Sequence, residues 1–178
     1  LSTWNGRIAG TLSASGDLDS LPDTQAAIDL STLRILIDST VIIDAEAFAI
    51  EARHGTVRIP DIRFQVGRNG TLSIAGSGRR RGRLDLSADA KIPLGIATLL
   101  YPDIGDVAGT LSVSAEVGGS FSDPRPAARI TLSDGAAVIP VLRQNLTNVN
   151  AAVTVEPGDL VLEQIEGSMD QGQFTITG

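Results

Sequence analysis

The sequence has no cysteine, and only 3% of its residues are aromatic. Without cysteine, the chain has no disulfide and no thiolate to offer a metal ion. With so few rings, its apolar surface is aliphatic, made of Ile, Leu, Val and Ala, with little to fill a thick core. No run approaches the roughly 18 consecutive apolar residues of a membrane-spanning helix. The total hydrophobic content of 42% is typical of a folded chain rather than a disordered one.

Positive charge and chemically reactive side chains are also scarce. The formal net charge of −7 disfavours a phosphate backbone, so we do not expect nucleic acid as a partner. His54 is the single histidine, and it precedes Gly55 in a predicted turn without recognisable catalytic or metal-binding neighbours. The acidic pairs Asp17/Asp19 and Asp103/Asp106 lack the ligand series of a calcium loop and are interpreted as solvated turns. We predict no catalytic residues, no metal site, no cofactor and no enzymatic activity.

What the chain does have is alternation of apolar and polar residues between glycines and prolines. In residues 146–178, Val149, Ala151, Val153 and Val155 alternate with polar or small residues, and Pro157-Gly158 turns the chain. A period of two over short runs separated by turn residues predicts strands with one apolar and one polar face. Nineteen glycines and many β-branched residues favour the same conclusion. The pattern predicts an all-β meander.

The same order of strand and turn signals occurs twice in the chain. Ile8–Ser13 (IAGTLS) reappears 99 positions later as Val107–Ser112 (VAGTLS). Gly55 matches Gly158 at an offset of 103, and Gly76 matches Gly178 at an offset of 102. Nearly constant offsets in the same order predict two copies of one unit. We divide the chain into repeat 1 (1–90), a short helical linker (91–105) and repeat 2 (106–178), packed in line.

Local signals predict where strands end. Asp38-Ser39-Thr40 breaks an apolar stretch, and Asn69-Gly70 predicts a type I′ hairpin turn. Asp123-Pro124-Arg125-Pro126 is expected to turn the second repeat. In Lys91–Pro102 the apolar period changes to a helical one, which predicts one short amphipathic helix as a cap over an open end of the sheet.

Alternation also predicts which side chains face a common interior. These residues are Ile28, Leu30, Ile59, Ile62, Phe64, Ile74, Leu111, Val113, Ile130, Leu132, Val153, Leu160, Leu162, Phe174 and Ile176. The one dense basic cluster is Arg79, Arg80, Arg81 and Arg83. It admits two interpretations: a solvated turn that keeps a sheet edge soluble, or contact with anionic lipid headgroups, because guanidinium groups bind phosphate in bidentate fashion.

The order of these motifs resembles the repeat unit of the TamB family and, more broadly, the AsmA-like bridge proteins of Gram-negative envelopes. The residues that carry the resemblance are the Gly-Thr-Leu strand, the Pro-x-x-Ala strand, an Asp134-Gly135 turn with Val-Ile-Pro, the Asn-Val-Asn-Ala strand and the closing Gly-x-Phe-x-Ile-x-Gly. It is clearest over 107–178 and weaker over 7–76. It implies a single, strongly curved sheet forming an open hydrophobic trough, called a β-taco, with the fifteen residues above facing lipid.

The resemblance also implies a biological setting. Such proteins are anchored in the inner membrane, span the periplasm and meet a TamA-type outer-membrane barrel. They carry phospholipid towards the outer membrane and support assembly of outer-membrane proteins, including autotransporters. We therefore expect a segment of a longer periplasmic protein whose groove shields phospholipid acyl chains. Two other functions stay open: a scaffold that binds unfolded outer-membrane strands by β-augmentation, and a ligand-free structural β-solenoid.

Overall fold

The computed structural model describes residues 3–16, 25–100, 105–139 and 144–178. In these ranges nearly every residue lies in a strand, and the single helix is five residues long. The all-β class and the short helix predicted from the sequence are thus confirmed. The elements are β1 (Trp4–Ser15), β2 (Gln25–Ile37), β3 (Thr40–Ala45), β4 (Phe48–Arg53), β5 (Thr56–Val66), β6 (Gly70–Arg79), β7 (Leu84–Pro93), α1 (Ile96–Leu100), β8 (Val107–Ser120), β9 (Asp123–Ile139), β10 (Gln144–Glu156), β11 (Asp159–Met169) and β12 (Gly172–Ile176).

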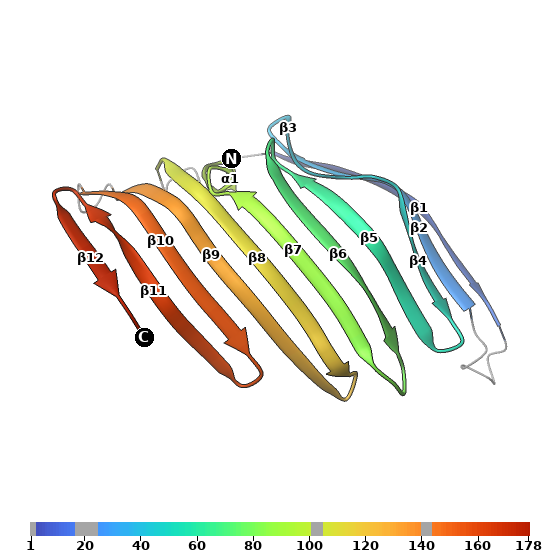
Figure 1. Ribbon diagram of the computed structural model, residues 1–178. Helices are drawn as coiled ribbons and strands as arrows, with labels where there is room; N and C mark the ends of the chain where they lie inside the picture. The colour runs from blue at the N-terminus through green and yellow to red at the C-terminus, as the bar shows by residue number, and fades with distance from the viewer. Residues whose placement is uncertain (1–2, 17–24, 101–104, 140–143) are drawn as a thin grey trace.

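All the strands belong to one antiparallel sheet, in the order β1-β2-β3-β5-β6-β7-β8-β9-β10-β11-β12 (Figure 1). β3 and β4 share one position in it: each pairs with a different half of β2, and both pair with β5. The predicted break at Asp38-Ser39 separates β2 from β3, and both residues have positive φ angles. The sheet is a continuous meander in which each position pairs with the next along the chain.

The pairing register separates the two faces of the sheet. Residues directly opposite each other in an antiparallel pair point to the same side. One row of such partners crosses ten positions and is apolar throughout: Ile8, Leu33, Ala45, Phe64, Leu72, Ala90, Val113, Ile130, Val153 and Leu162. The adjacent row is almost entirely polar: Arg7, Arg34, Asp44, Gln65, Thr71, Lys91, Ser112, Thr131, Ala152 and Gln164. We call these sides the apolar face and the polar face.

The sheet is curved, and irregular pairing accompanies the curvature. The register shifts at Gly10 between β1 and β2, at Ile59/Ile62 between β5 and β6, and at Ala108/Thr110 between β8 and β9. Extra residues on one strand bend it and increase its twist. Figure 1 shows β7 to β12 face on, whereas β1 and β2 are seen nearly edge-on at the right. The sheet is therefore not flat.

Few side chains in the described residues are fully buried. They are all aliphatic: Ile37 is 2% exposed, Ile42 5%, Ile62 5%, Leu84 6% and Val66 8%. No described polar or charged residue is buried. The helix α1 packs against the β5–β6 turn, since a Cβ added at Gly67 would lie 3.4 Å from Ile96 Cδ1. The apolar residues gather on one side of a single layer without a second layer of strands in the described part.

Three turns predicted from the sequence differ from those in the structure. The first is the type I′ turn predicted at Asn69-Gly70. Val66 pairs with Gly70, so Gly67 begins the β5–β6 loop and takes the positive φ of 58°, whereas Asn69 and Gly70 do not form a type I′ pair. Gly70 instead joins the strand at a close approach, where a Cβ would lie 2.5 Å from the Val66 carbonyl oxygen. The hairpin itself forms at the predicted place, but glycine at position 67 supplies its left-handed residue.

The stretch Asp123-Pro124-Arg125-Pro126 does not turn the chain. The turn is Phe121-Ser122, and Pro124 and Pro126 lie inside β9, opposite Gly119 and Val117 of β8. Pairing with β10 starts only at Ala128, so this end of β9 is an edge on that side, where a residue without N–H is tolerated. Asp134-Gly135 is likewise a bulge within β9, where Asp134 has a φ of 52° and a register shift faces Gly109.

The division into two repeats stays a prediction from the sequence. The structure adds a physical reason for one of its matched positions. Gly10 of β1 and Gly109 of β8 both lie beside a register shift. A Cβ at Gly10 would lie 2.4 Å from the Asp29 carbonyl oxygen, and one at Gly109 would lie 2.8 Å from Gly135 Cα. The glycine of each Gly-Thr-Leu strand is needed where the partner backbone approaches most closely.

Candidate functional site

The candidate site is the apolar face itself. On each side of the central row lie further apolar rows, one of which is Ile62, Ile74, Ala88, Ala115, Ala128, Val155 and Leu160. Another contains Leu111, Leu132, Ala151, Ile165 and Ile176. Near the β6–β7 turn, a further row of cross-strand partners consists of small and aliphatic residues: Ala14, Ala26, Ala52, Val57, Gly78 and Leu84. An aliphatic surface therefore extends over the whole sheet.

The register places all fifteen side chains predicted to face a common interior on this face. Ile130, Leu132, Val113 and Leu111 are direct cross-strand partners, and Phe174 follows the same alternation as Ile176. Ile62 is buried, and eleven others are partly covered by their neighbours. Ile28, Leu160 and Ile176 are 43%, 72% and 52% exposed. The face is thus brought together by pairing but is only partly withdrawn from solvent; its contact with lipid stays a prediction.

Glycines on the apolar face create room for large side chains opposite them. Gly167 pairs with Phe174, and a Cβ at Gly167 would lie 2.8 Å from Phe174 Cζ. Gly76 pairs with Leu86 in the same way, with Leu86 Cδ2 2.8 Å from the added Cβ. Large residues fold over glycines, which smooths the surface into a continuous layer. These pairs could not be predicted from the sequence, because they depend on the register between neighbouring strands.

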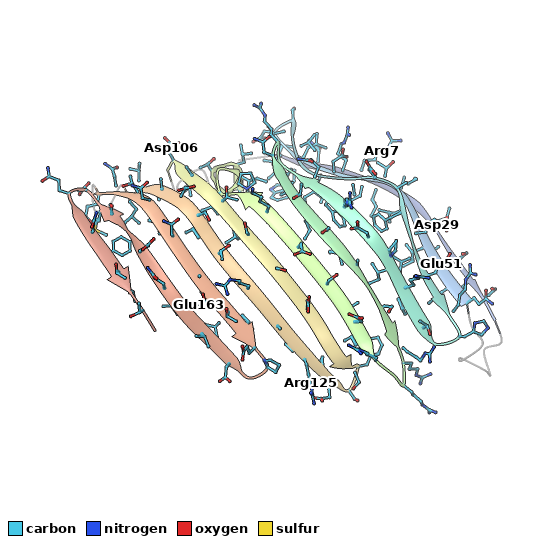
Figure 2. The ribbon with its side chains drawn as sticks, viewed as in Figure 1. Arg7, Asp29, Glu51, Asp106, Arg125 and Glu163 are labelled. Atoms are coloured by element: carbon cyan, nitrogen blue, oxygen red, sulfur yellow. The ribbon has the colours of Figure 1, made fainter. Side chains whose placement is uncertain are left out.

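The polar face carries cross-strand ion pairs. Arg34 donates to both carboxylate oxygens of Asp44, at 2.9 and 3.0 Å. Arg129 binds Glu163 in the same bidentate way, at 2.9 and 2.7 Å, and Thr154 Oγ1 donates to Glu163 Oε1 at 2.7 Å. The hydrogen bond from Thr154, together with Arg129, lowers the pKa of Glu163, and the bond from Arg34 lowers the pKa of Asp44. Figure 2 labels Glu163 among the charged side chains along the sheet.

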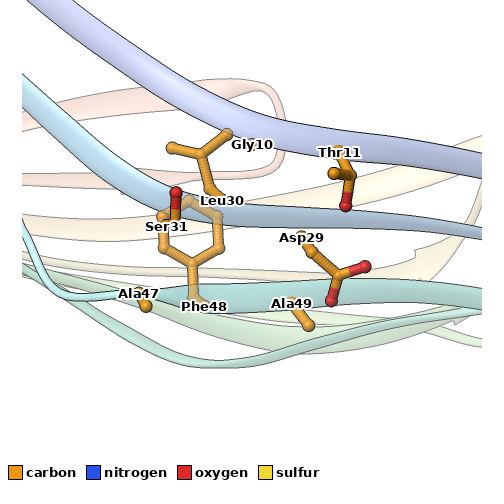
Figure 3. Close-up of a pocket in the computed structure, with 8 residues that line it drawn as sticks. All are labelled: Gly10, Thr11, Asp29, Leu30, Ser31, Ala47, Phe48 and Ala49. Atoms are coloured by element: carbon orange, nitrogen blue, oxygen red, sulfur yellow. The ribbon is translucent and has the colours of Figure 1, made fainter.

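A hollow of about 490 Å³ lies where β3 gives way to β4, beside the first register shift (Figure 3). Leu30 and Phe48, which are cross-strand partners, lie close together there, and Phe48 meets Phe64 edge to face with ring centroids 6.1 Å apart. The lining is mixed: Gly10, Thr11, Asp29, Leu30, Ser31, Ala47, Phe48 and Ala49. Its one carboxylate, Asp29, lies among the hydroxyls of Thr11 and Ser31, and this lining holds no second titratable group to form an acid–base pair with it.

The remaining candidates lie at the rims of the sheet. His54 is an exposed turn residue with a φ of 50°, between β4 and β5. Arg79 ends β6, and Arg80, Arg81 and Arg83 form the turn to β7. Asp17, Asp19 and Asp103 lie outside the described residues. Within those residues, no three His, Cys, Asp or Glu side chains are placed to hold a metal ion.

Comparison with protein-family models, with curated proteins and with solved structures finds no match to this chain. The likeness to the TamB family therefore stays a resemblance of motifs in the sequence. Among the described residues, no helix is long and apolar enough to cross a membrane.

Proposed function

We propose that this chain shields phospholipid acyl chains on the apolar face of its sheet. The observation that supports the proposal is the unbroken apolar row from Ile8 to Leu162 across ten strand positions. A sheet needs such a face only if something apolar covers it, because contiguous exposed apolar surface mediates binding or promotes aggregation. The occupant has to be apolar along its whole length and narrow enough to lie on one layer.

An acyl chain meets both requirements. One leaflet of a membrane is about half of a ~30 Å hydrocarbon core. Apolar side chains recur along a strand about every 7 Å, so an acyl chain of that length spans two or three of them. Strands β8 and β9 are 14 and 17 residues long, which is more than sufficient. Apart from a few rings, such as those of Phe64 and Phe174, the side chains of this face are aliphatic, so an acyl chain can lie close to the strands.

The setting of this activity follows from the resemblance to the TamB family and is part of the proposal. The chain is then a periplasmic segment of an inner-membrane-anchored bridge protein that delivers phospholipid to the outer membrane and meets a TamA-type barrel. Support of outer-membrane protein and autotransporter assembly belongs to the same proposal. No catalytic step is involved, since moving a lipid along a surface breaks no bond.

A scaffold function is the second candidate, and one observation favours it. Within the described residues β1 pairs only with β2, and β12 only with β11. Such edges present unpaired backbone groups to which an unfolded outer-membrane strand adds by β-augmentation. A ligand-free solenoid has less support, because a filled stalk needs a closed interior and the described strands form one open layer.

Single charges on the two faces separate these functions. Ile130→Asp or Leu160→Arg places a charge on the apolar face, where it must be desolvated beside an acyl chain at a cost of several kcal/mol. We expect either variant to keep its β-sheet circular dichroism but to lose crosslinking of a photoactivatable phospholipid. Thr131→Asp and Val161→Asp, on the polar face, are the matched controls and are expected to retain it.

The same variants are then tested for binding to an unfolded outer-membrane strand. The conduit predicts little change there, since β-augmentation uses mainly the backbone of an edge strand. If Ile130→Asp retains lipid crosslinking while changes along β1 or β12 abolish strand binding, the conduit is wrong and the scaffold replaces it.

A further inference from the structure

The two rims of the sheet differ in charge. One rim is formed by the turns β4–β5, β6–β7, β8–β9 and β10–β11, and it contains Arg79, Arg80, Arg81 and Arg83 within five residues. At the opposite rim, the described turns β2–β3, β5–β6 and β11–β12 carry Asp38, Arg68 and Asp170 without a comparable cluster. Figure 2 shows Arg125 at the first rim and Asp106 at the other. A chain with a net charge of −7 thus concentrates positive charge at one place.

Most arginines outside this turn have a carboxylate partner. Arg34, Arg53, Arg63, Arg125 and Arg129 each form an ion pair with Asp44, Glu51, Asp61, Asp123 and Glu163 respectively. Among the described residues, Arg80, Arg81 and Arg83 form none. Arg79 differs from them, since its Nε donates to Thr56 Oγ1 at 3.4 Å on the polar face. Within the cluster, the guanidinium groups available to an anion are therefore those of Arg80, Arg81 and Arg83.

The backbone of the turn is held in place. The Arg79 N–H donates to the Arg83 carbonyl at 3.1 Å, and the Gly82 N–H donates to the Arg79 carbonyl at 2.9 Å. The Arg80 N–H donates to the Gly55 carbonyl at 2.9 Å, which ties this turn to the neighbouring β4–β5 turn. Three like charges on a fixed turn repel one another. An anion placed among them relieves that repulsion.

The apolar face reaches the arginines through Phe121. A Cβ added at Gly78 would lie 2.7 Å from Phe121 Cζ and 3.1 Å from Leu84 Cδ1, so the ring lies over the last apolar row. Leu84 is only 6% exposed, whereas Phe121 itself is 55% exposed. A hollow of about 740 Å³ at this rim is lined by Arg80, Arg81, Gly82, Arg83, Gly119, Ser120, Phe121 and Ser122. Aliphatic surface, an aromatic ring, hydroxyls and guanidinium groups follow one another over a short distance.

We propose that this hollow binds the phosphate of an anionic phospholipid whose acyl chains lie on the apolar face. The proposal rests on the proposed function and makes it more specific. Arg80, Arg81 and Arg83 supply bidentate donors to the phosphate. Phe121 covers the first part of the acyl chain where it leaves the headgroup, and the hydroxyls of Ser120 and Ser122 complete the polar lining. The lipid then has one orientation, with its headgroup at the basic rim.

Two carboxylates lie near the hollow and limit its charge. Asp123 is paired with Arg125 at 3.4 Å, and Asp85 lies on the polar face opposite Ser77. Neither forms an ion pair with the turn arginines. The hollow therefore keeps the positive charge of Arg80, Arg81 and Arg83, so it selects an anionic headgroup over a zwitterionic one that carries its own ammonium group.

The test compares two photoactivatable lipids with identical acyl chains, phosphatidylglycerol and phosphatidylcholine, each presented to the complete chain in phosphatidylcholine vesicles. The readout is the ratio of crosslinked phosphatidylglycerol to crosslinked phosphatidylcholine. A basic residue near an anionic lipid contributes about fivefold, so for three arginines we expect a ratio of at least about tenfold at low salt. Changing Arg80, Arg81 and Arg83 together to Ser should bring the ratio close to one and leave phosphatidylcholine crosslinking unchanged.

Changing Arg7, Arg63 and Arg68 together to Ser removes the same charge elsewhere, and this control should keep the ratio. Phe121→Ser should lower crosslinking of both lipids at this rim. Inorganic phosphate at about 1 mM should leave the ratio unchanged, since an exposed site needs the acyl chain for affinity.

The possible outcomes separate the two proposals. A wild-type ratio of one, an unchanged ratio in the Arg80/Arg81/Arg83 variant or an equal loss in the control variant overturns the headgroup site while leaving acyl shielding intact. Loss of the preference in 1 mM inorganic phosphate assigns the hollow to free phosphate and also overturns it. If the wild-type chain crosslinks neither lipid, the proposed function itself fails.

Discussion

Ile62 and Arg63 are consecutive residues of β5, yet they lie in opposite environments. Ile62 is 5% exposed on the apolar face, whereas the Arg63 side chain is 78% exposed on the polar face and pairs with Asp61 at 2.7 Å. The same contrast recurs along the strands, at Ile130 and Thr131 for example. In a single layer, a period of two in the sequence is enough to make one face apolar and the other polar.

The two faces also differ in what completes them. On the polar face, charged groups meet partners within the sheet, as Arg34 meets Asp44 and Arg129 meets Glu163. On the apolar face most side chains are only partly covered, and Leu160 remains 72% exposed. The charged groups of these pairs on the polar face already have partners, whereas the apolar side chains of the other face remain partly exposed to water. This difference is the physical reason to assign ligand binding to the apolar face.

The largest expected effect on stability comes from truncating a buried side chain of the apolar face. Ile62→Ala should lower the free energy of unfolding by about 2–4 kcal/mol, because it removes buried methyl groups and leaves a cavity. Arg63→Ala, one residue away, should change it by less than about 1 kcal/mol, as is usual for exposed ion pairs. Urea unfolding followed by circular dichroism measures both. Equal losses would mean that the two faces do not differ in packing.

A smaller effect is expected where glycine allows close approach. Gly76→Ala should destabilise the sheet by about 1–3 kcal/mol. The added Cβ would lie 2.3 Å from the Asp85 carbonyl oxygen and 2.8 Å from Leu86 Cδ2, and Gly76 has a φ of 150°. Gly118→Ala is the control, since its Cβ would meet nothing within 4 Å, and should change stability by less than about 0.5 kcal/mol. A tolerated alanine at position 76 would contradict the packing of the apolar face.

The smallest effect concerns the polar face and pH. The Thr154 hydroxyl and Arg129 lower the pKa of Glu163, so Thr154→Val should raise it towards the ordinary value of about 4.3. Because the folded-state pKa is depressed, the stabilising contribution is present above about pH 4.3 and is lost as the pH falls through the folded value. The difference in unfolding midpoint between wild type and Glu163→Gln should therefore shrink at acidic pH. Carboxyl NMR titration checks the first statement; a pKa unchanged in Thr154→Val would contradict it.

Much of the fold could be predicted from the sequence because the alternation is regular. A period of two determines the face of each residue once it is in a strand, which is why all fifteen predicted interior residues share the apolar face. The helix at Ile96–Leu100 was predictable for a related reason, since the apolar period changes there between Pro93 and Pro102.

Backbone irregularities could not be predicted in the same way. Asp134-Gly135 has the composition of a turn but forms a bulge, because β8 and β10 flank β9 on both sides and hold the chain extended. Pro124 and Pro126 also have the composition of a turn, but pairing with Gly119 and Val117 of β8 keeps them in β9. Phe121 could not be identified from the sequence, because it packs over Gly78, which is far from it along the chain, and the β6–β7 and β7–β8 registers bring the two together.

Under the proposed function, acyl chains contact one face of the sheet only. A photo-crosslinking amino acid placed at Val113 on the apolar face, or at the neighbouring Ser114 on the polar face, tests it in vesicles of phosphatidylglycerol and phosphatidylcholine. Val113 pairs with Ala90 and Ile130, and Ser114 with Asp89 and Arg129, so the two probes differ in face and hardly in position. We expect lipid adducts by mass spectrometry at position 113 and none above background at position 114. Equal labelling at both positions, or labelling at 114 alone, would contradict it.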